Sequence, residues 1–235
     1  MLIVVIARRR RGLISETLRN PLSLFEMSGR SALVTGATGA FGRAVSLALA
    51  AMGVKLTIAG SSKEELDAVA AEIVELGSEA VKLYLRPDSL HDAEAMRDAA
   101  LAAYGRLDQL VIASGYNKAG FIQDQDYEEW QAIMDANVRG AWFMAKAVGK
   151  HWIDNKIKGK VVLMSSVRGR HGNVSGYTGY CTSKGASDAL TRVLATKPFP
   201  AIAHKIGLPR ATVAWSRSRI SSRVNRRAIA KFLFV

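Results

Sequence analysis

Short apolar runs alternate with longer amphipathic segments over most of the chain, and this alternation predicts strands that alternate with helices. Fully apolar short runs are typical of buried strands, whereas apolar residues recurring every three or four positions are typical of helices that cover a sheet. The expected strands are 32–35, 54–59, 80–85, 107–113 and 160–165, and the expected helices are 43–50, 62–76, 90–104, 126–155 and 179–195. This order predicts an α/β fold of three layers, with a parallel sheet between two helical layers.

A glycine-rich turn joins the first expected strand to the first expected helix. The run from Thr35 to Gly42 has glycines at positions 36, 39 and 42. Glycine lets the backbone turn sharply and approach a pyrophosphate, and the following helix N-terminus offers free N–H groups and the positive end of the helix dipole. Because such a glycine pattern alone is a weak signal, its interpretation as a dinucleotide site depends on a second motif.

The second motif follows the strand at 160–165. Ser166 lies at the strand end, and Tyr180 and Lys184 lie four residues apart in the next expected helix, on one face of it. A phenol is a poor acid or base at neutral pH, but a neighbouring ammonium lowers its pKa. With Ser166 holding a substrate oxygen, these groups predict a proton-transfer site for a carbonyl/alcohol pair. Taken alone, the pair is a weak signal, because a surface tyrosine stacked on a lysine stem explains it more often.

Together the two motifs resemble the short-chain dehydrogenase/reductase family. The matching pieces are Thr35-Gly36-x-x-Gly39-x-x-Gly42, Asn137, Ser166 and Tyr180-Cys181-Thr182-Ser183-Lys184. The resemblance extends from about residue 24 to about residue 195. It implies a Rossmann-type doubly wound parallel sheet, and an NAD(P)-dependent oxidoreductase that moves hydride between nicotinamide and a carbonyl or secondary alcohol.

The resemblance also implies roles for individual residues. Tyr180 is expected to be the general acid/base, and Lys184 is expected to lower the pKa of a phenol beside it and to hold the nicotinamide ribose. Ser166 is expected to orient the substrate carbonyl, and Asn137 to kink its helix and support the proton relay. The spacing of 14 from Ser166 to Tyr180 is one longer than the commonest spacing in the family, so Ser165 is the alternative to Ser166.

The choice between NADP and NAD depends on the residues after the second expected strand. An acidic residue there binds the ribose 2′-OH of NAD and repels the 2′-phosphate of NADP. No acid occurs before Glu64, whereas Ser61, Ser62 and Lys63 offer hydrogen bonds and positive charge to a phosphate. The sequence therefore favours NADP, with NAD as the alternative. Ser61 and Ser62 fit equally well as caps of the following helix.

Two segments at strand ends depart from the family pattern. Residues 86–88 read Arg-Pro-Asp where the family has an acid-containing segment that contacts adenine, and residues 112–115 read Ile-Ala-Ser-Gly in place of Asn-Asn-Ala-Gly. The small residues still allow a ribose or nicotinamide to approach the backbone. The expected cofactor-binding residues are Gly36, Thr38, Gly39, Phe41, Gly42, Ser61, Ala113, Ser114, Gly115, Tyr180 and Lys184.

The net charge of +13 is concentrated at the two ends of the chain. Residues 1–30 carry +4 and residues 197–235 carry +9 without any acid, whereas residues 31–196 carry equal numbers of basic and acidic side chains. We therefore expect an N-terminal extension at 1–28, a dinucleotide-binding catalytic core at 29–196 and a divergent basic tail at 197–235. Basic tails can bind nucleic acid or an anionic membrane, but the neutral core favours neither partner.

The basic tail lacks the motifs with which the family completes its sheet. Prolines at 198 and 200 end the last core helix, and within the tail only residues 211–215 are strand-like. One interpretation is a non-homologous replacement that leaves the sheet without its last strand or strands and impairs the substrate pocket. The other is a divergent tail that still adds one strand and one helix. The first interpretation leads to a second functional hypothesis, a non-catalytic dinucleotide-binding module.

Composition argues against several other classes of protein. A single cysteine, Cys181, allows no internal disulfide and suits a reducing compartment. The four histidines lack metal-ligand spacing, and the apolar run at 1–7 is far shorter than a membrane span. We expect a cytoplasmic protein without metal, nucleic acid or membrane partners. We also expect a small-molecule carbonyl or alcohol substrate, and homo-oligomer contacts through the helices at 126–155 and 179–195.

Overall fold

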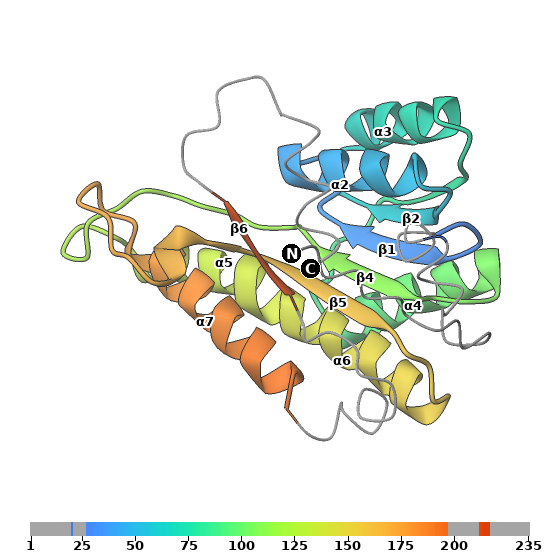
Figure 1. Cartoon of the computed structure of the whole chain (residues 1–235). Helices are drawn as coiled ribbons and strands as arrows, with labels where there is room; N and C mark the ends of the chain where they lie inside the picture. Colours follow the sequence, from blue (N-terminus) through green and yellow to red (C-terminus); the bar gives the residue numbers. More distant parts are fainter. Residues whose placement is uncertain (1–19, 21–26, 197–211, 217–235) are drawn as a thin grey trace, which may run out of the picture.

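The protein is described by a computed structural model that covers residue 20, residues 27–196 and the strand Thr212–Ser216. Six parallel strands form one sheet in the order β3-β2-β1-β4-β5-β6 (Figure 1). Chain order reverses between β1 and β4, so this pair is the topological switch point, beside which ligands bind in open α/β sheets. The strands are β1 (Ser31–Thr35), β2 (Lys55–Ala59), β3 (Ala80–Leu83), β4 (Gln109–Ile112), β5 (Lys160–Ser166) and β6 (Thr212–Ser216).

Helices cover both faces of the sheet (Figure 1). On one face α2 contacts α3, and on the other α4 contacts α6 while α7 contacts β5. This arrangement confirms the predicted Rossmann-type, doubly wound α/β/α fold. The helical elements are α2 (Ala40–Ala50), α3 (Lys63–Glu75), α4 (Leu90–Tyr104), α5 (Tyr127–Met134), the π-helix η2 (Asp135–Arg139), α6 (Gly140–Asp154), the 3₁₀ helix η3 (Val167–Gly169) and α7 (Thr178–Leu194).

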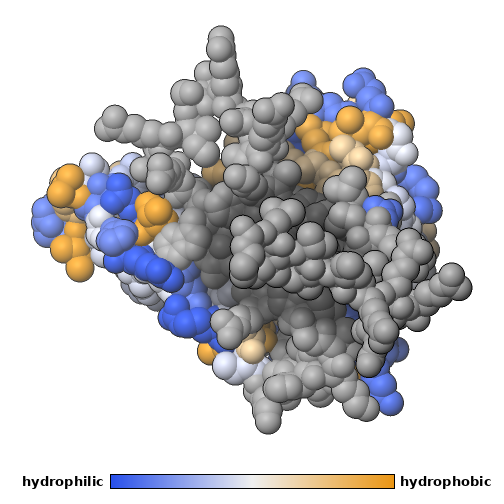
Figure 2. All heavy atoms as spheres, viewed as in Figure 1, coloured by the Kyte–Doolittle hydropathy of each residue, from blue (hydrophilic) through white to orange (hydrophobic). Residues whose placement is uncertain are grey.

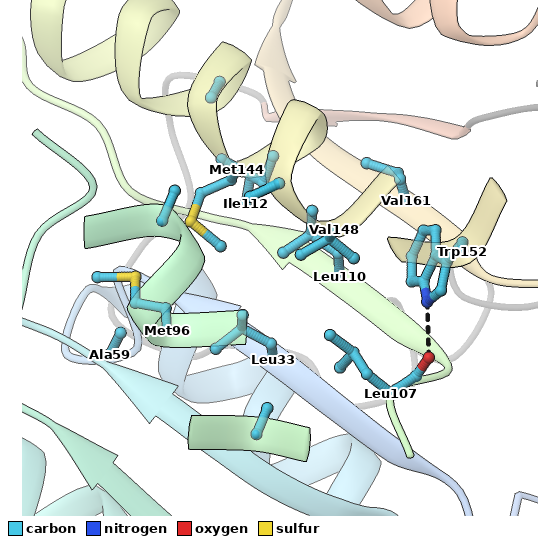
Figure 3. Close-up of a cluster of buried hydrophobic side chains, with 14 of the residues drawn as sticks. Leu33, Ala59, Met96, Leu107, Leu110, Ile112, Met144, Val148, Trp152 and Val161 are labelled. Atoms are coloured by element: carbon cyan, nitrogen blue, oxygen red, sulfur yellow. Dashed lines mark hydrogen bonds between the residues drawn. The ribbon is translucent and has the colours of Figure 1, made fainter. Parts of the chain in front are cut away.

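The larger hydrophobic cluster fills the space between the sheet and the helices α4 and α6 (Figure 3). Its largest side chain, Trp152, is 2% exposed, and its indole Nε1 donates a hydrogen bond to the Leu107 carbonyl at 2.7 Å. Gly159 packs so closely on this indole that a Cβ there would collide with the ring. The bond and the contact fix the end of α6 against the starts of β4 and β5.

The opposite face of the sheet is covered by α2 and α3. Val34 and Ile58 on the strands pack with Leu49 of α2 and Leu66 of α3, all of them buried. Alternate residues of β1 therefore belong to different clusters, with Leu33 on the α4/α6 face and Val34 on the α2/α3 face. A strand buried on both faces reads as a continuous apolar run, which is why the sequence revealed it.

Most of the predicted elements lie where the pattern placed them, but several ends differ: β3 ends at Leu83 rather than at residue 85, and α2 begins at Ala40 rather than at residue 43. The strand expected at 107–113 is shorter, because β4 spans only Gln109–Ile112. The helix expected at 126–155 is not a single α-helix, because the π-helical segment Asp135–Arg139 separates α5 from α6. Of the two serines expected as alternatives for capping, Ser62 caps α3, since its Oγ accepts the Glu65 N–H at 3.4 Å.

Two loops at the carboxyl-terminal edge of the sheet run side by side (Figure 1). The loop after β4 and the loop before α7 meet where the Gly120 N–H donates to the Gly176 carbonyl at 2.5 Å, beside an isolated bridge to Tyr177. Ile122 is 77% exposed and Val174 is 93% exposed on these loops. Figure 2 shows apolar and polar residues intermixed at this outer end of the molecule.

The tail contributes one strand to the described structure. β6 lies beside β5 in parallel register, with Met164 opposite Ala214. The strand agrees with the alternative in which the tail adds one strand and one helix, but the helix of that alternative lies outside the described residues. No seventh strand occurs among the described residues. The rest of the basic tail and nearly all of the N-terminal extension lie outside the described residues, so the domain boundaries at 28 and 196 stay predictions. Within the described part of the chain, no helix is both long and apolar enough to span a bilayer.

Candidate active site

A cavity of about 470 Å³ opens at the carboxyl ends of β1, β2 and β4, beside the switch point. It extends from the glycine turn across the strand ends to the π-helical segment. Its position is the one expected for a dinucleotide in a sheet of this topology. The described residues that line it are Thr35, Gly36, Thr38, Gly39, Ala59, Gly60, Ser61, Leu85, Arg86, Pro87, Asp88, Ala113, Ser114, Gly115, Tyr116, Ala132, Asp135, Ala136 and Gly140.

The glycine turn forms one wall of this cavity. Gly36 has a φ of +67°, and a Cβ there would lie 2.5 Å from the Ser114 Cα and backbone nitrogen. At Gly42 a Cβ would collide with the Gly36 carbonyl oxygen, whereas at Gly39 the nearest atom would be that oxygen at 3.4 Å. Gly36 and Gly42 are therefore required by the turn itself. Gly39 is the N-cap of α2 and leaves backbone open for a phosphate to approach.

The carboxyl ends of β1 and β4 form the floor of the cavity. The Thr35 Oγ1 and the Ser114 Oγ lie 3.1 Å apart and are hydrogen-bonded. This bond joins the ends of β1 and β4 next to the segment where the sequence departs from the family's Asn-Asn-Ala-Gly pattern. Gly115 is followed by Tyr116, whose side chain is 44% exposed at the cavity.

Asn137 lies in the π-helical segment and fastens the loop after β4 to α7. Its side chain is 3% exposed, and its Oδ1 accepts the Tyr116 N–H at 2.7 Å. Its Nδ2 donates to the Tyr116 carbonyl and to the Ser183 Oγ, each at 2.9 Å. A π-bulge widens one helical turn and is frequent at functional sites. Here it places a helical asparagine against the loop after β4, while the kink and the proton relay that the family resemblance implies for Asn137 stay predictions.

Tyr180 and Lys184 share one face of α7, as their spacing predicts. The Lys184 Nζ lies 5.6 Å from the centroid of the Tyr180 ring and donates to the Met164 carbonyl at 2.8 Å. It also lies 3.7 Å from the position that a Cβ on Gly115 would occupy, next to the cavity floor. Burial disfavours the ammonium and lowers the pKa of Lys184 from 10.5 to about 8, although the nearby Asp188 carboxylate acts in the opposite direction.

The two serines at the end of β5 have different surroundings. The Ser166 Oγ accepts the Arg168 N–H at 3.2 Å, which leaves its own proton available to a substrate oxygen. The Ser165 Oγ instead donates to the Asp188 Oδ1 at 2.5 Å, within the contact between β5 and α7. This geometry favours Ser166 over Ser165 as the substrate-orienting serine.

The predicted cofactor residues divide into two groups. The first group lies outside the cavity lining. Phe41 is 38% exposed on the first turn of α2, and Gly42 packs against Gly36. Tyr180 and Lys184 lie on α7, with the Lys184 ammonium next to Gly115. These four are not among the described residues that line the cavity. Gly36, Thr38, Gly39, Ser61, Ala113, Ser114 and Gly115 do line it.

Sequence reasoning missed Arg86 and Asp135 in the cavity and Asp188 beside Lys184. Arg86 was noted only as a departure from the family pattern, although its place directly after the third strand was itself a signal. Asp188 follows Lys184 by four residues on the same helix, and this spacing could have identified it. Within the described residues, no group of three or more His, Cys, Asp or Glu side chains could hold a metal ion.

The buried ammonium of Lys184 predicts a pH-dependent stability. Its folded pKa of about 8 lies below the usual 10.5, so the unfolded chain binds the proton more tightly and folding is penalised fully below about pH 8. The penalty disappears as the pH rises towards 10.5, and it is at most about 3 kcal/mol. Lys184→Met removes this penalty, but it also leaves the Met164 carbonyl without a donor and the buried Asp188 carboxylate without a cation. These two losses depend much less on pH between 7 and 10 than the lysine penalty does.

We therefore expect the melting temperature of Lys184→Met, taken relative to that of the unmodified protein, to be higher at about pH 7 than at about pH 10. Thermal unfolding followed by circular dichroism at both pH values measures this. Lys150→Met, on the exposed surface of α6, is the control and should show no such pH dependence. A difference between Lys184→Met and the unmodified protein that is the same at both pH values would contradict the buried-charge explanation.

The fold and the site together define a Rossmann-type dinucleotide-binding protein. Residues 30–201 match the family described as short chain dehydrogenase. The chain is 44% identical over 178 residues to an uncharacterised oxidoreductase of Mycobacterium tuberculosis, a match that covers 75% of this chain and 64% of that protein. The chain belongs to the short-chain dehydrogenase/reductase family.

Further relatives agree with this assignment. A 3-oxoacyl-[acyl-carrier-protein] reductase of Synechocystis is 32% identical over 170 residues, covering 72% of this chain and 68% of that protein. A short-chain type dehydrogenase/reductase from Mycobacterium marinum superposes with a TM-score of 0.75 at 31% identity, covering 77% of this chain and 74% of that one. NAD⁺-bound xylitol dehydrogenase gives a TM-score of 0.68 at 31% identity, covering 72% and 64%.

Proposed function

We propose that the protein is an NAD(P)-dependent oxidoreductase that interconverts a small carbonyl compound and a secondary alcohol. The observation that carries the proposal is the buried Lys184 ammonium, fixed on the Met164 carbonyl and facing the Tyr180 ring beside Gly115. Burying a cation costs free energy unless nearby acceptors or negative charges compensate it, so a buried ammonium beside a cavity indicates a functional role. At this position it stabilises negative charge on a phenol, and it lies next to the cavity floor.

The residues of the cavity fit a nicotinamide dinucleotide. The glycine turn and the N-terminus of α2 would hold the pyrophosphate, and Gly115 with Lys184 would hold the nicotinamide ribose. When bound, the nicotinamide supplies or accepts the hydride. The chain's own task is to place the substrate carbonyl beside it and to handle the proton.

The proton transfer is assigned to the groups at the ends of β5 and α7. In reduction, the Ser166 hydroxyl donates a hydrogen bond to the carbonyl oxygen, and Tyr180 gives its phenolic proton to that oxygen as charge develops on it. Lys184 stabilises the phenolate that remains. Because the Asn137 side chain is committed to Tyr116 and Ser183, it acts in this scheme by holding the loop after β4 in place.

A direct assay tests the proposed function. The full chain is mixed with NADPH or NADH and a panel of ketones and aldehydes, and loss of the reduced nicotinamide is followed by absorbance. We expect turnover of at least one carbonyl compound, and oxidation of the matching secondary alcohol with the oxidised cofactor. Cofactor binding by fluorescence titration without turnover on any member of the panel would favour the non-catalytic dinucleotide-binding module instead.

We further propose that NADP is preferred over NAD. No carboxylate follows β2, and Ser61 and Arg86 both line the cavity. Arg86 pairs with Asp88 only at 3.6 Å, with both side chains 56% exposed, so its guanidinium can turn to a phosphate at little cost. Ser62 is committed to capping α3, which leaves Ser61 as the hydroxyl that is free to bind the 2′-phosphate.

This preference predicts the behaviour of two variants. Ser61→Asp should weaken NADPH binding at least tenfold, because a carboxylate repels the 2′-phosphate, while NADH binding changes little; tenfold corresponds to about 1.4 kcal/mol. Arg86→Gln should weaken NADPH binding several-fold and leave NADH binding nearly unchanged. Fluorescence titration of both cofactors measures this, with Lys55→Gln at the opposite end of β2 as the control. Tighter binding of NADH by the unmodified protein would contradict the preference.

Homo-oligomer formation through α6 and α7 is also proposed. Trp142 and Ile153 on α6 are 46% and 39% exposed, and Val193 on α7 is 65% exposed. Large apolar side chains on two neighbouring helices favour contact with a second copy of the chain. Light scattering of the unmodified protein and of a Trp142→Glu, Val193→Glu double variant tests this, since the double variant should show the smaller mass.

A further inference from the structure

Three consecutive residues of β5 each bind a different part of the site. The Met164 carbonyl accepts a hydrogen bond from the Lys184 ammonium at 2.8 Å. The Ser165 hydroxyl donates to the Asp188 carboxylate at 2.5 Å, and Ser166 is the proposed substrate-orienting serine. Lys184 and Asp188 are 6% and 4% exposed. The end of one strand therefore fastens a buried cation and a buried anion that lie one helical turn apart on α7.

The surroundings of the Asp188 carboxylate are unusual for a purely structural group. Its Oδ1 accepts from Ser165, but its Oδ2 is buried without a hydrogen-bond partner in the described part of the chain. Gly169 of η3 packs over this oxygen, because a Cβ there would lie 3.0 Å from it. A buried carboxylate oxygen without a donor is unfavourable, and a nearby cation is the remaining way to compensate it.

Lys184 is the cation that the described structure offers. On α7 the other titratable group facing the Lys184 ammonium is Tyr180. On η2, Asp135 and Arg139 pair with each other at 3.0 Å, and on η3 the Arg168 guanidinium donates to the Gly172 carbonyl. Neither 164–166 nor 212–216 contains a titratable residue. Asp188 is the charge that favours the ammonium of Lys184 against the effect of burial.

We propose that Asp188 is a positioning residue for Lys184: its carboxylate, held in place by Ser165, keeps the lysine in the ammonium form beside Tyr180. The catalytic consequence rests on the proposed function, because the ammonium is the form that stabilises a phenolate. The electrostatic part of the proposal concerns the protonation of Lys184 in the protein without cofactor or substrate, so it does not depend on the proposed function. It explains why a strand-end serine and a helical aspartate are buried together behind the site.

The electrostatic part is tested without any enzyme activity. Lysine side-chain carbon resonances of the full chain are followed by NMR through the alkaline range, and Lys184 is assigned by its loss in Lys184→Met. Asp188→Asn, which keeps the acceptor for Ser165, should move the Lys184 titration midpoint down by about one pH unit. Asp154→Asn, an exposed carboxylate-to-amide change on α6, should leave that midpoint unchanged.

Should Asp188→Asn fail to fold, the unmodified protein still gives an answer. The carboxyl carbon resonance of Asp188 should then show a step at the same pH at which Lys184 titrates, because coupling between two groups is reciprocal. An unchanged midpoint in a folded Asp188→Asn variant, or no step at Asp188 in the unmodified protein, would overturn the proposal.

The catalytic part is tested by the pH dependence of turnover. A midpoint that falls from about 8 to about 7 leaves roughly a fifth as much ammonium at pH 8 and nearly the same amount at pH 6. We therefore expect Asp188→Asn to be about fivefold slower at pH 8 and nearly unchanged at pH 6, as the alkaline limb of the rate profile moves to lower pH. An equal loss at both pH values would indicate a merely structural role. If the NMR midpoint moves but neither protein turns over any carbonyl, the electrostatic part stands and the proposed function fails.

Discussion

Replacing Tyr180 with phenylalanine is expected to lower kcat for carbonyl reduction by about 10²- to 10⁴-fold, the range that a positioned general acid contributes. The ring and its contact with Lys184 remain, so the fold and the lysine keep their surroundings. Cofactor affinity should change less than about threefold, because the proton is needed only in the chemical step. Steady-state kinetics and fluorescence titration on the same preparations measure the two effects.

The neighbouring Tyr177 supplies a matched control. Its ring lies 6.4 Å from that of Tyr180 in an edge-to-face arrangement, directly before the first turn of α7. Tyr177→Phe therefore removes the same hydroxyl from a ring in the same region, and it should keep most of the rate. If Tyr180→Phe retains most of the rate, or if both variants lose it equally, Tyr180 is not the general acid.

Much of the fold could be predicted because its strands are buried on both faces. β5 contains the apolar run 161–164, and in β2 the apolar residues from Leu56 to Ala59 are interrupted only by Thr57. The helix α4 begins and ends where the pattern placed it, with Gly105 in the left-handed conformation at its C-cap. Hydrophobic periodicity reports burial, and burial in a two-faced sheet leaves a strong signal. Strand ends were less well predicted, since the residues there are small and serve the cavity.

The π-helical segment could not be predicted from periodicity. Trp130, Ile133 and Val148 recur at helical spacing on both sides of it, so the pattern reads as one helix. The extra residue in the π turn is stabilised by tertiary bonds from Asn137 to Tyr116 and Ser183, which are 21 and 46 residues away in the chain. Only the family resemblance pointed to Asn137, and it did so without specifying these partners.

The choice between the two serines also needed the three-dimensional structure. Ser165 and Ser166 are identical in chemistry and adjacent in sequence, and the loop that follows is one residue longer than is common in the family. Alternation along a strand sends neighbouring side chains to opposite faces. The hydrogen bond from Ser165 to Asp188 then identifies which serine belongs to the contact between β5 and α7.

The glycine turn gives the second large expected effect. At Gly42 a Cβ would collide with the Gly36 carbonyl and would also lie 2.9 Å from the Ala37 Cα. These are backbone atoms, so no side chain can move aside to make room. We therefore expect Gly42→Ala to lower the free energy of unfolding by about 3 kcal/mol, at the upper end of the range for overpacking, and to abolish measurable cofactor binding because Gly36 must move.

Gly39→Ala separates this collision from the general effect of adding a methyl group to the turn. Its Cβ would meet only the Gly36 carbonyl oxygen, at 3.4 Å, which is ordinary van der Waals contact. Its backbone is extended, with φ −69° and ψ 156°, so alanine is not strained there. The exchange of glycine for alanine at an N-cap should cost less than about 1 kcal/mol.

Urea unfolding and cofactor titration on both glycine variants measure these effects. We expect Gly39→Ala to fold like the unmodified protein while it binds the cofactor at least tenfold more weakly, because the new methyl group projects where the pyrophosphate approaches. Equal stability of Gly42→Ala and Gly39→Ala would show that the turn relaxes around a Cβ at 42. Unchanged cofactor affinity in Gly39→Ala would remove the pyrophosphate from this wall of the cavity.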